Sequence, residues 1–438
     1  MLEALMSAPV LVKVLGTLGL ILVVNLLRVP FVLAVVIGTL ALAAWCGHPP
    51  AAILSIGAHR LFSPEALLLG VAIYVVIWLS SQMEACGVMR DLVHTLQARY
   101  SRKAALAMLP AVIGFLPMPG GALFSAPLID RCDTDGNIPP LLKTQINYWF
   151  RHIWEYWWPL YPGVLLMMQI TGLQVWQLML VGVPLTLAAL GAGYFFYLRR
   201  LPRFEYTPEE QEATESLPSL LLPIIVIVIV YAAVALGYAG VRWLQPGLPK
   251  LDNFIPMIIG VVCAMFVLQR RRPLPWATWK KIMLSTKTLQ MMAIVLALHV
   301  YGAYIGAKLP NGTPLIAEMR GDLAHWGIPL IAVMMLIPFI SGLTFGVAFG
   351  FVGASLPIVV SLLGPTPSLV QVLSTTVLAY GCGYIGMMLS PMHVCLVVTN
   401  EHFGSSLYRS LAGILKPAAA VFCGVIVVHL AVKWLLGG

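Results

Sequence analysis

The sequence predicts an all-α polytopic membrane protein, with about ten transmembrane helices and two re-entrant hairpins in two inverted-topology repeats. Of its 438 residues, 60% are hydrophobic and only 10% are charged, so lipid must cover most of the surface. The apolar runs are uniform and long, unlike the short alternating segments of a β-barrel. In addition, two apolar runs interrupted by Pro and Gly occupy corresponding places in the two halves, which is typical of secondary transporters.

The first repeat is expected over residues 1–198. Its opening run lacks the short core and small-residue cleavage site of a signal peptide, so we interpret it as a first span. The expected elements are two scaffold helices within 10–46, a span at 64–81, an amphipathic segment at 83–100, a hairpin at 109–129, a broken helix at 147–169 and a span at 175–198.

Residues 199–216 form the expected cytoplasmic linker, since this polar stretch contains five glutamates. The second repeat, 217–438, is expected to follow the same order: spans at 217–239, 254–269 and 284–307, an amphipathic segment at 315–326, a hairpin at 337–359, a broken helix within 368–400 and a span at 411–436. Each half has five crossings, because a hairpin does not change sides. An odd number of crossings makes the second half enter the membrane from the opposite face, which predicts the inverted topology.

The hairpins are predicted because Pro and Gly lie where a straight membrane helix tolerates them least, as at Pro117 and Pro119. Their small side chains, hydroxyls and freed backbone groups are candidates for binding a substrate, with a possible Na⁺ near Gly121 and Gly342. Close helix packing is the alternative. The hairpin candidates are Gly120, Gly121 and Ser125 in the first, and Ser341, Gly342, Thr344 and Ser355 in the second.

The segment from Asn147 to Gly163 carries ionisable residues within a spanning run, which marks them as functional candidates together with Asn147. We expect Arg151 to neutralise an anionic substrate and Glu155, four residues on, to hold its guanidinium. His152 is a candidate for proton coupling. The alternative is a basic cluster at the membrane surface, among interfacial tryptophans.

The matching segment of the second half is expected to break at Pro391, with Ser390 and His393 beside the freed backbone groups. A Gly-rich helix that packs closely on a neighbour is the alternative. The His152/Glu155 spacing also suits a helical metal site, but no partner pair is evident. The seven scattered cysteines are interpreted as small apolar residues, and no resident cofactor is expected.

Most Lys and Arg residues fall in alternate loops, for example Arg270, Arg271 and Arg272. The positive-inside rule therefore predicts an inner-membrane protein with both termini outside. The net charge of +9 fits this bias and does not indicate nucleic-acid binding. The HExxH, GxSxG and P-loop motifs are absent from the sequence, so an enzyme is not expected.

Four motifs carry a resemblance to a known group of proteins: PMPGG (Pro117–Gly121), RHIWEYWWPLYPG (Arg151–Gly163), SGLTFG (Ser341–Gly346) and LSPMHVC (Leu389–Cys395). With these the chain resembles the ion-transporter superfamily of gluconate permease-like, citrate and dicarboxylate carriers, and within it a prokaryotic integral-membrane family of unknown function. The resemblance implies inverted repeats, one site per protomer, a homodimer and elevator-type alternating access. The Ser-Asn-Thr hairpin signature of the sodium/dicarboxylate branch is absent.

The function we expect is secondary active transport of a small anionic, carboxylate-type metabolite, coupled to H⁺ or Na⁺. A cation/proton antiporter is the alternative within transport, with Glu155 and His152 as the exchanging groups. An intramembrane enzyme or lipid-handling protein is the alternative from another class, although no nucleophile or metal constellation supports it.

Overall fold

The protein is entirely helical in the part that its computed structural model describes, which comprises residues 7–115, 121–133, 135–201 and 216–437. Within these ranges there is no strand, only an isolated bridge between Lys308 and Pro314. Among the helices of the described ranges, seven are long and apolar enough to cross a membrane, or eight if one bent pair counts as a span. The expected all-α polytopic membrane protein is therefore confirmed.

In the first half, the described residues form ten helices and a short 3₁₀ turn at Leu198–Arg200. They are α2 (Val10–Leu26), α3 (Phe31–Trp45), α4 (Pro50–Leu61), α5 (Pro64–Ala85), α6 (Val88–Arg99), α7 (Arg102–Gly114), α8 (Gly121–Cys132), α9 (Pro140–Arg151), α10 (Pro162–Thr171) and α11 (Val175–Phe196). Local sequence sets several starts. The Ser63 hydroxyl, for instance, accepts a hydrogen bond from the Ala66 N–H and caps α5, and Pro64 occupies the first helical position.

The second half begins with a single turn, α12 (Leu217–Leu220). It continues with α13 (Leu222–Leu244), α14 (Phe254–Arg271), α15 (Trp276–Met283), α16 (Thr286–Ile305), α17 (Leu315–His325), α18 (Leu330–Phe345), α19 (Ala348–Ser361), α20 (Leu369–Met388), α21 (Val394–Phe403) and α22 (Leu407–Leu435). Helix α20 starts at a capping box, in which Ser368 and Gln371 satisfy each other's backbone N–H groups.

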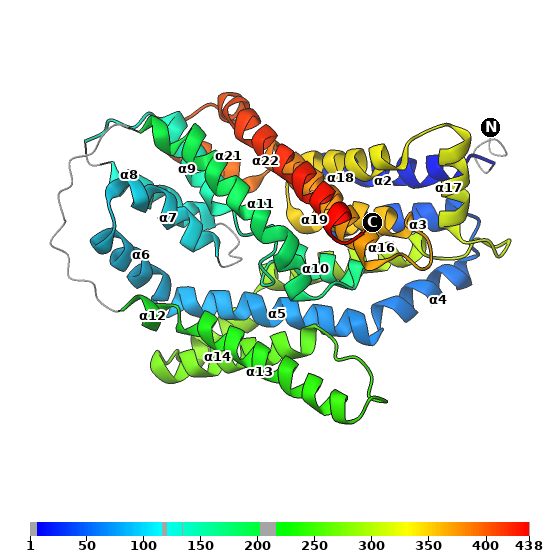
Figure 1. Ribbon diagram of the computed structural model, residues 1–438, viewed down its shortest axis with the longest axis horizontal. Helices are drawn as coiled ribbons and strands as arrows, with labels where there is room; N and C mark the ends of the chain where they lie inside the picture. Colours follow the sequence, from blue (N-terminus) through cyan, green and yellow to red (C-terminus); the bar gives the residue numbers. More distant parts are fainter. Residues whose placement is uncertain (1–6, 116–120, 134, 202–215, 438) are drawn as a thin grey trace.

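The helices of the two halves correspond in order, α2–α11 with α13–α22, and they pack in corresponding pairs. The pair α2/α3 matches α13/α14, and the hairpin α7/α8 matches α18/α19. The halves also interlock, because α8 packs on α21 and α19 packs on α10. In Figure 1 the two hairpins lie toward opposite ends of the long axis, with α10 and α19 near the middle.

Several boundaries differ from those expected. The helices α4 and α15 were not predicted, because they are too short for a hydropathy window that seeks spans. Both hairpins are longer than predicted: α7 begins at Arg102 and α18 at Leu330. The expected ten crossings require α2, α3 and the interrupted α9–α10 segment in addition to the seven long helices.

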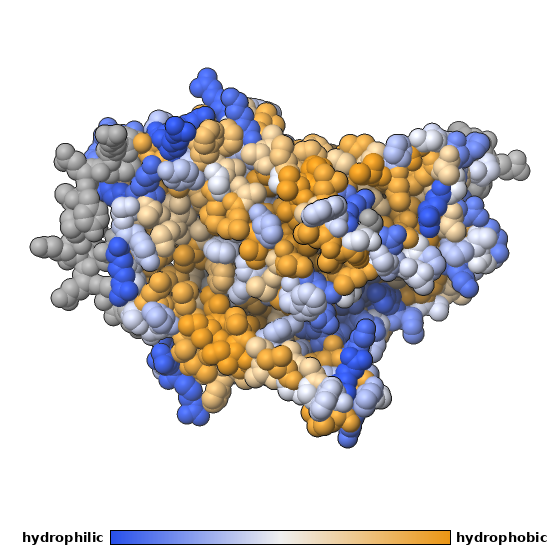
Figure 2. Space-filling model, viewed as in Figure 1, coloured by the Kyte–Doolittle hydropathy of each residue, from blue (hydrophilic) through white to orange (hydrophobic). Residues whose placement is uncertain are grey.

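The helices differ widely in burial. Within its apolar window α20 is 78% buried, whereas α13 is only 6% buried, so α20 lies at the centre and α13 at the periphery. Figure 2 shows hydrophobic side chains over the α13–α14 region and across the middle of this face, with hydrophilic side chains mostly toward the two ends of the long axis. Such a band is expected of a protein that lipid surrounds.

Candidate functional site

Two interrupted helices meet at the centre of the protein. In the first half α9 ends at Arg151 and α10 begins at Pro162, so His152 and Glu155 lie in the turns between them. Because α9 ends at Arg151, this residue and Glu155 do not share a helical turn as the sequence suggested. In the second half α20 ends at Met388 and α21 begins at Val394, which leaves Ser390 and His393 in the interruption.

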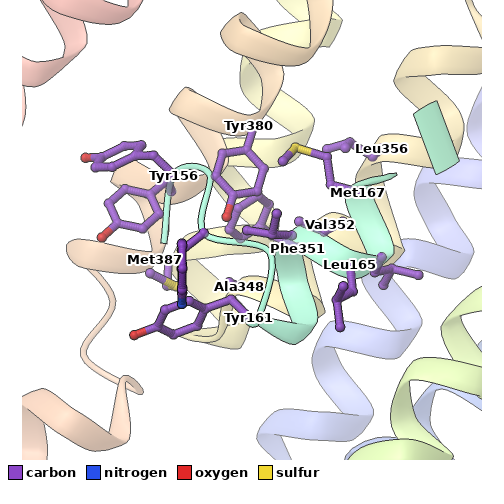
Figure 3. Packing of buried hydrophobic residues seen from close by; sticks show 14 of the residues in the cluster. Tyr156, Tyr161, Leu165, Met167, Ala348, Phe351, Val352, Leu356, Tyr380 and Met387 are labelled. Atoms are coloured by element: carbon purple, nitrogen blue, oxygen red, sulfur yellow. The ribbon is translucent and has the colours of Figure 1, made fainter. Parts of the chain in front are cut away.

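Tyrosines from neighbouring helices satisfy carbonyl groups that the interruptions expose. Tyr384 donates to the His152 carbonyl oxygen at 2.5 Å, and Tyr380 donates to that of Glu155. In the reverse direction Tyr148 donates to the Met388 carbonyl oxygen at 3.1 Å. Figure 3 shows Tyr380 and its neighbours where α20 meets α19 and the first interruption. Each break is therefore stabilised by the other half, as irregular backbone away from water requires.

Glycines let the hairpins approach these breaks closely. A Cβ atom at Gly121, the first residue of α8, would lie 2.5 Å from Nη2 of Arg151, and one at Gly114 would overlap the Arg151 carbonyl oxygen. Gly346, between α18 and α19, has a φ of +61°, and its Cβ would lie 2.8 Å from the His393 backbone nitrogen. The first hairpin thus contacts the first break, and the second hairpin contacts the second break.

A buried polar cluster joins the two breaks. Arg151, His152, Glu155 and His393 are at most 9% exposed. His152 Nδ1 donates to the Tyr148 carbonyl oxygen at 2.6 Å, which directs Nε2 toward Glu155 Oε1 at 3.9 Å. The rings of His152 and His393 lie 4.8 Å apart. Among the described residues, neither ring nitrogen of His393 has a hydrogen-bond partner.

Two further residues lie near this cluster, and only one of them was a predicted site residue. Asn147, a predicted site residue, donates from Nδ2 to Thr399 Oγ1 at 3.2 Å, and its buried Oδ1 has no partner within the described ranges. Cys395 was interpreted as an apolar residue, yet its Sγ lies within 4.8 Å of a ring nitrogen of each histidine. The spacing His393-x-Cys395 was the only signal in the sequence, and it is too common to indicate a site.

Most of the remaining predicted residues form hydrogen bonds within their own helices or pack against neighbouring helices. Ser125, Thr344 and Ser355 donate to the carbonyl oxygens of Gly121, Ile340 and Phe351, so their protons are not directed at a ligand. Ser390 Oγ accepts from the Met392 N–H, and Gly342 packs on Gly383 and Met387 of α20. The buried Ser341 hydroxyl, in contrast, has no hydrogen-bond partner among the described residues. Gly120 lies outside the described residues.

A cavity of about 330 Å³ adjoins the first hairpin. Ile113 and Leu123 line it, and these residues are next to, or two positions from, the glycines that contact Arg151. Its polar lining comprises Glu84, Arg90, His94 and Arg131. The lining is therefore mainly apolar, and its polar part is mainly basic.

The fold is similar to that of a solved transporter. The crystal structure of the YdaH transporter of Alcanivorax borkumensis, described as having an unusual topology, superposes with a TM-score of 0.58 and 12% sequence identity, over 88% of this chain and 90% of that one. No curated protein matches the chain. The family model described as "Protein of unknown function (DUF401)" matches residues 10–432, and the chain belongs to this family.

Proposed function

We propose that the protein is a secondary active transporter of a small anionic metabolite of the carboxylate type, with coupling to H⁺ or Na⁺. The observation that carries this proposal is the burial of Arg151 at a helix break, against the first residue of a hairpin helix. A buried guanidinium at membrane depth is expensive and marks a functional site by default. Its fork of donors suits a carboxylate.

Two helix N-termini add to the attraction for an anion. Helix α8 begins at Gly121, beside the Arg151 guanidinium, and α21 begins directly after His393. These two helices pack on each other, so both starts belong to one region. A helix N-terminus carries partial positive charge and free N–H groups, and discontinuous helices direct such ends at anionic substrates in transporters.

The cavity beside the first hairpin supports an access route and an elevator-type movement. Arg90, His94 and Arg131 in its wall attract anions, and its volume leaves space into which the hairpin can move. The similarity in fold to the YdaH transporter also supports transport. Membership of the ion-transporter superfamily, an inner-membrane location with both termini outside and the division into inverted repeats at 1–198 and 217–438 belong to the same proposal.

Coupling and assembly complete the proposal. His152 and Glu155 form a buried pair suited to a proton, and a Na⁺ near Gly121 and Gly342 is the alternative coupling ion.

The exposed helix α13 is the proposed homodimer interface. A Cβ at Gly237 or Gly240 would meet nothing within 4 Å, and small residues of this kind let membrane helices approach closely. Light scattering of the Gly237→Leu variant is expected to show loss of the dimer.

Transport is tested by uptake of radiolabelled organic anions into proteoliposomes under an imposed proton or sodium gradient. Wild-type protein is expected to accumulate at least one carboxylate with one of these gradients, and Arg151→Ala is expected to abolish that accumulation. Arg151→Lys keeps the charge but loses the fork, so partial activity is expected. Gradient-independent flux, or an Arg151→Ala variant as active as wild type, would refute the assignment.

A cation/proton antiporter is the second candidate, and the contact of 3.9 Å between buried His152 and Glu155 favours it. In this mechanism the Glu155 carboxylate exchanges a proton for a cation. Everted vesicles with a pH-sensitive dye distinguish the two functions. Cation addition should collapse a proton gradient only in an antiporter, and Glu155→Gln should then prevent the collapse.

A further inference from the structure

We propose that His152, His393 and Cys395 bind a monovalent copper ion at the junction of the two helix breaks. One ligand atom from each residue lies within 4.8 Å of the other two. His152 follows the end of α9, whereas His393 and Cys395 flank the start of α21, so the site joins the two halves of the chain. This inference goes beyond anion transport and does not depend on it.

The histidines are arranged as metal ligands are. The Tyr148 carbonyl oxygen can only accept, so His152 Nδ1 carries the proton in their 2.6 Å hydrogen bond, and the Nε2 lone pair is available for a metal. A hydrogen bond from the second ring nitrogen to a backbone carbonyl is the usual support of a metal-bound histidine.

His393 supplies the independent observation that a ligand belongs here. It is 5% exposed, and both of its ring nitrogens lack a partner among the described residues. A buried polar group without a partner costs about 1–3 kcal/mol, so such a group requires an explanation. Coordination of one nitrogen to a metal removes this cost for that nitrogen, and the ring has no hydrogen bond in these ranges to break when it turns toward the ion.

The donor set selects copper(I) over zinc. Two imidazoles and one thiolate form the three-coordinate set typical of copper sites, whereas structural zinc takes four ligands. Bonds of about 2.0–2.3 Å require the three donors to close by roughly an ångström, which side-chain rotation supplies. Arg151 directly precedes His152 in the chain and is buried in the same cluster. Whatever the charge on Glu155, a monovalent ion adds one positive charge fewer than Zn²⁺ beside this guanidinium.

Binding involves no change of oxidation state. The Cys395 thiol loses its proton to solvent as the Sγ–Cu bond forms, so one proton is released for each ion bound. Cys395 is half-buried. A bound ion would link His152, which directly follows the end of α9, to the first turn of α21.

The test is anaerobic titration of purified full-length protein with copper(I) against a competing chromogenic chelator, with copper X-ray absorption of the loaded protein. The variants are Cys395→Ser and His393→Gln. The control is Cys382→Ser, because Cys382 is a buried cysteine that is not part of the cluster. Wild type and the control are expected to bind one high-affinity ion with one sulfur and two nitrogen ligands. Each cluster variant should weaken this binding by about 100-fold or more.

Equal affinity in wild type, Cys395→Ser and His393→Gln would overturn the site, as would a copper spectrum without sulfur. Gel filtration of each variant shows that it remains folded, and the two cluster variants alter different ligands. Proton release of one per ion in wild type, and none in Cys395→Ser, is a further expected result. Anion uptake is measured separately with copper chelated, so failure of the metal site and failure of the transport proposal give different results.

Discussion

The two hairpins have the same design but are seated differently. In the second, α19 packs on α16: a Cβ at Gly353 would lie 2.6 Å from Leu298, and one at Gly302 would lie 3.2 Å from Pro357. In the first, α8 instead borders the cavity of about 330 Å³ that α5 and α6 also line. The cavity beside Pro357 is smaller, at about 140 Å³. One hairpin is closed against its neighbours and the other borders an open cavity, a difference that the proposed alternating access would use.

The two breaks also differ, in the charge of the residue that ends the helix before each of them. The last residue of α9 is the cation Arg151, and the last residue of α20 is the apolar Met388. At the end of the helix that precedes each break, a charged side chain is therefore present only in the first half. The proposed transport of an anion needs a positive charge at only one of the two breaks.

The comparison of the breaks gives the largest expected effect. Arg151→Ala should lower anion uptake at least about 100-fold, because a substrate carboxylate would lose its charge-assisted hydrogen bonds. Met388→Ala, at the corresponding position, should reduce thermal stability but retain uptake within about tenfold. Uptake and melting temperature are measured for both variants. A larger loss of uptake in Met388→Ala than in Arg151→Ala would reverse the assignment of charge to the first break.

The closed hairpin should tolerate added volume poorly. Gly353→Ala places a methyl group against Leu298 and is expected to destabilise the protein by about 1–3 kcal/mol. Gly19→Ala is the control, since a Cβ there meets nothing within 4 Å, and it should leave stability unchanged or slightly raised. Thermal unfolding in detergent measures both. Equal melting temperatures would show that α19 is not tightly seated on α16.

The open hairpin should accept volume but lose movement. Leu123 lines the cavity and is 60% exposed, so Leu123→Trp is expected to fold normally and to slow uptake about fivefold by filling the space. Leu187 on α11 is 62% exposed and lies outside that cavity, which makes Leu187→Trp the matched control. Initial uptake rates at saturating substrate are compared. Identical rates for the two variants would argue against movement into the cavity.

The smallest expected effect concerns a tyrosine that supports the first break. Tyr384→Phe removes the shorter of the two hydrogen bonds to the His152 carbonyl oxygen, which keeps the Glu155 N–H at 3.2 Å, and should cost about 1 kcal/mol. Tyr408 is 80% exposed, so Tyr408→Phe serves as the control and should be neutral. Unfolding midpoints measure this difference. A neutral Tyr384→Phe would mean that water or another group satisfies the carbonyl.

The sequence predicted the helical class, the interrupted segments and the region of each break, because Pro and Gly act locally and hydropathy reports lipid directly. It did not predict α4 and α15, which are too short to span. The end of α9 at Arg151, within the predicted broken helix at 147–169, also escaped prediction, since it depends on donors such as Tyr384 from the other half. Likewise, the proximity of Cys395 to His152 arises only in the folded structure, so the sequence did not predict it.

The interlocking of the halves has a consequence for biogenesis. Helix α8 needs α21, whose first residue, Val394, leaves the ribosome about 260 residues after Cys132, an interval on the order of ten to fifty seconds. During that interval the nascent hairpin lacks its final neighbour and is open to chaperones, insertases and proteases. Truncation before α21 should therefore yield a chain that inserts but is degraded. Survival of the protein would then depend on synthesis of the complete C-terminal half.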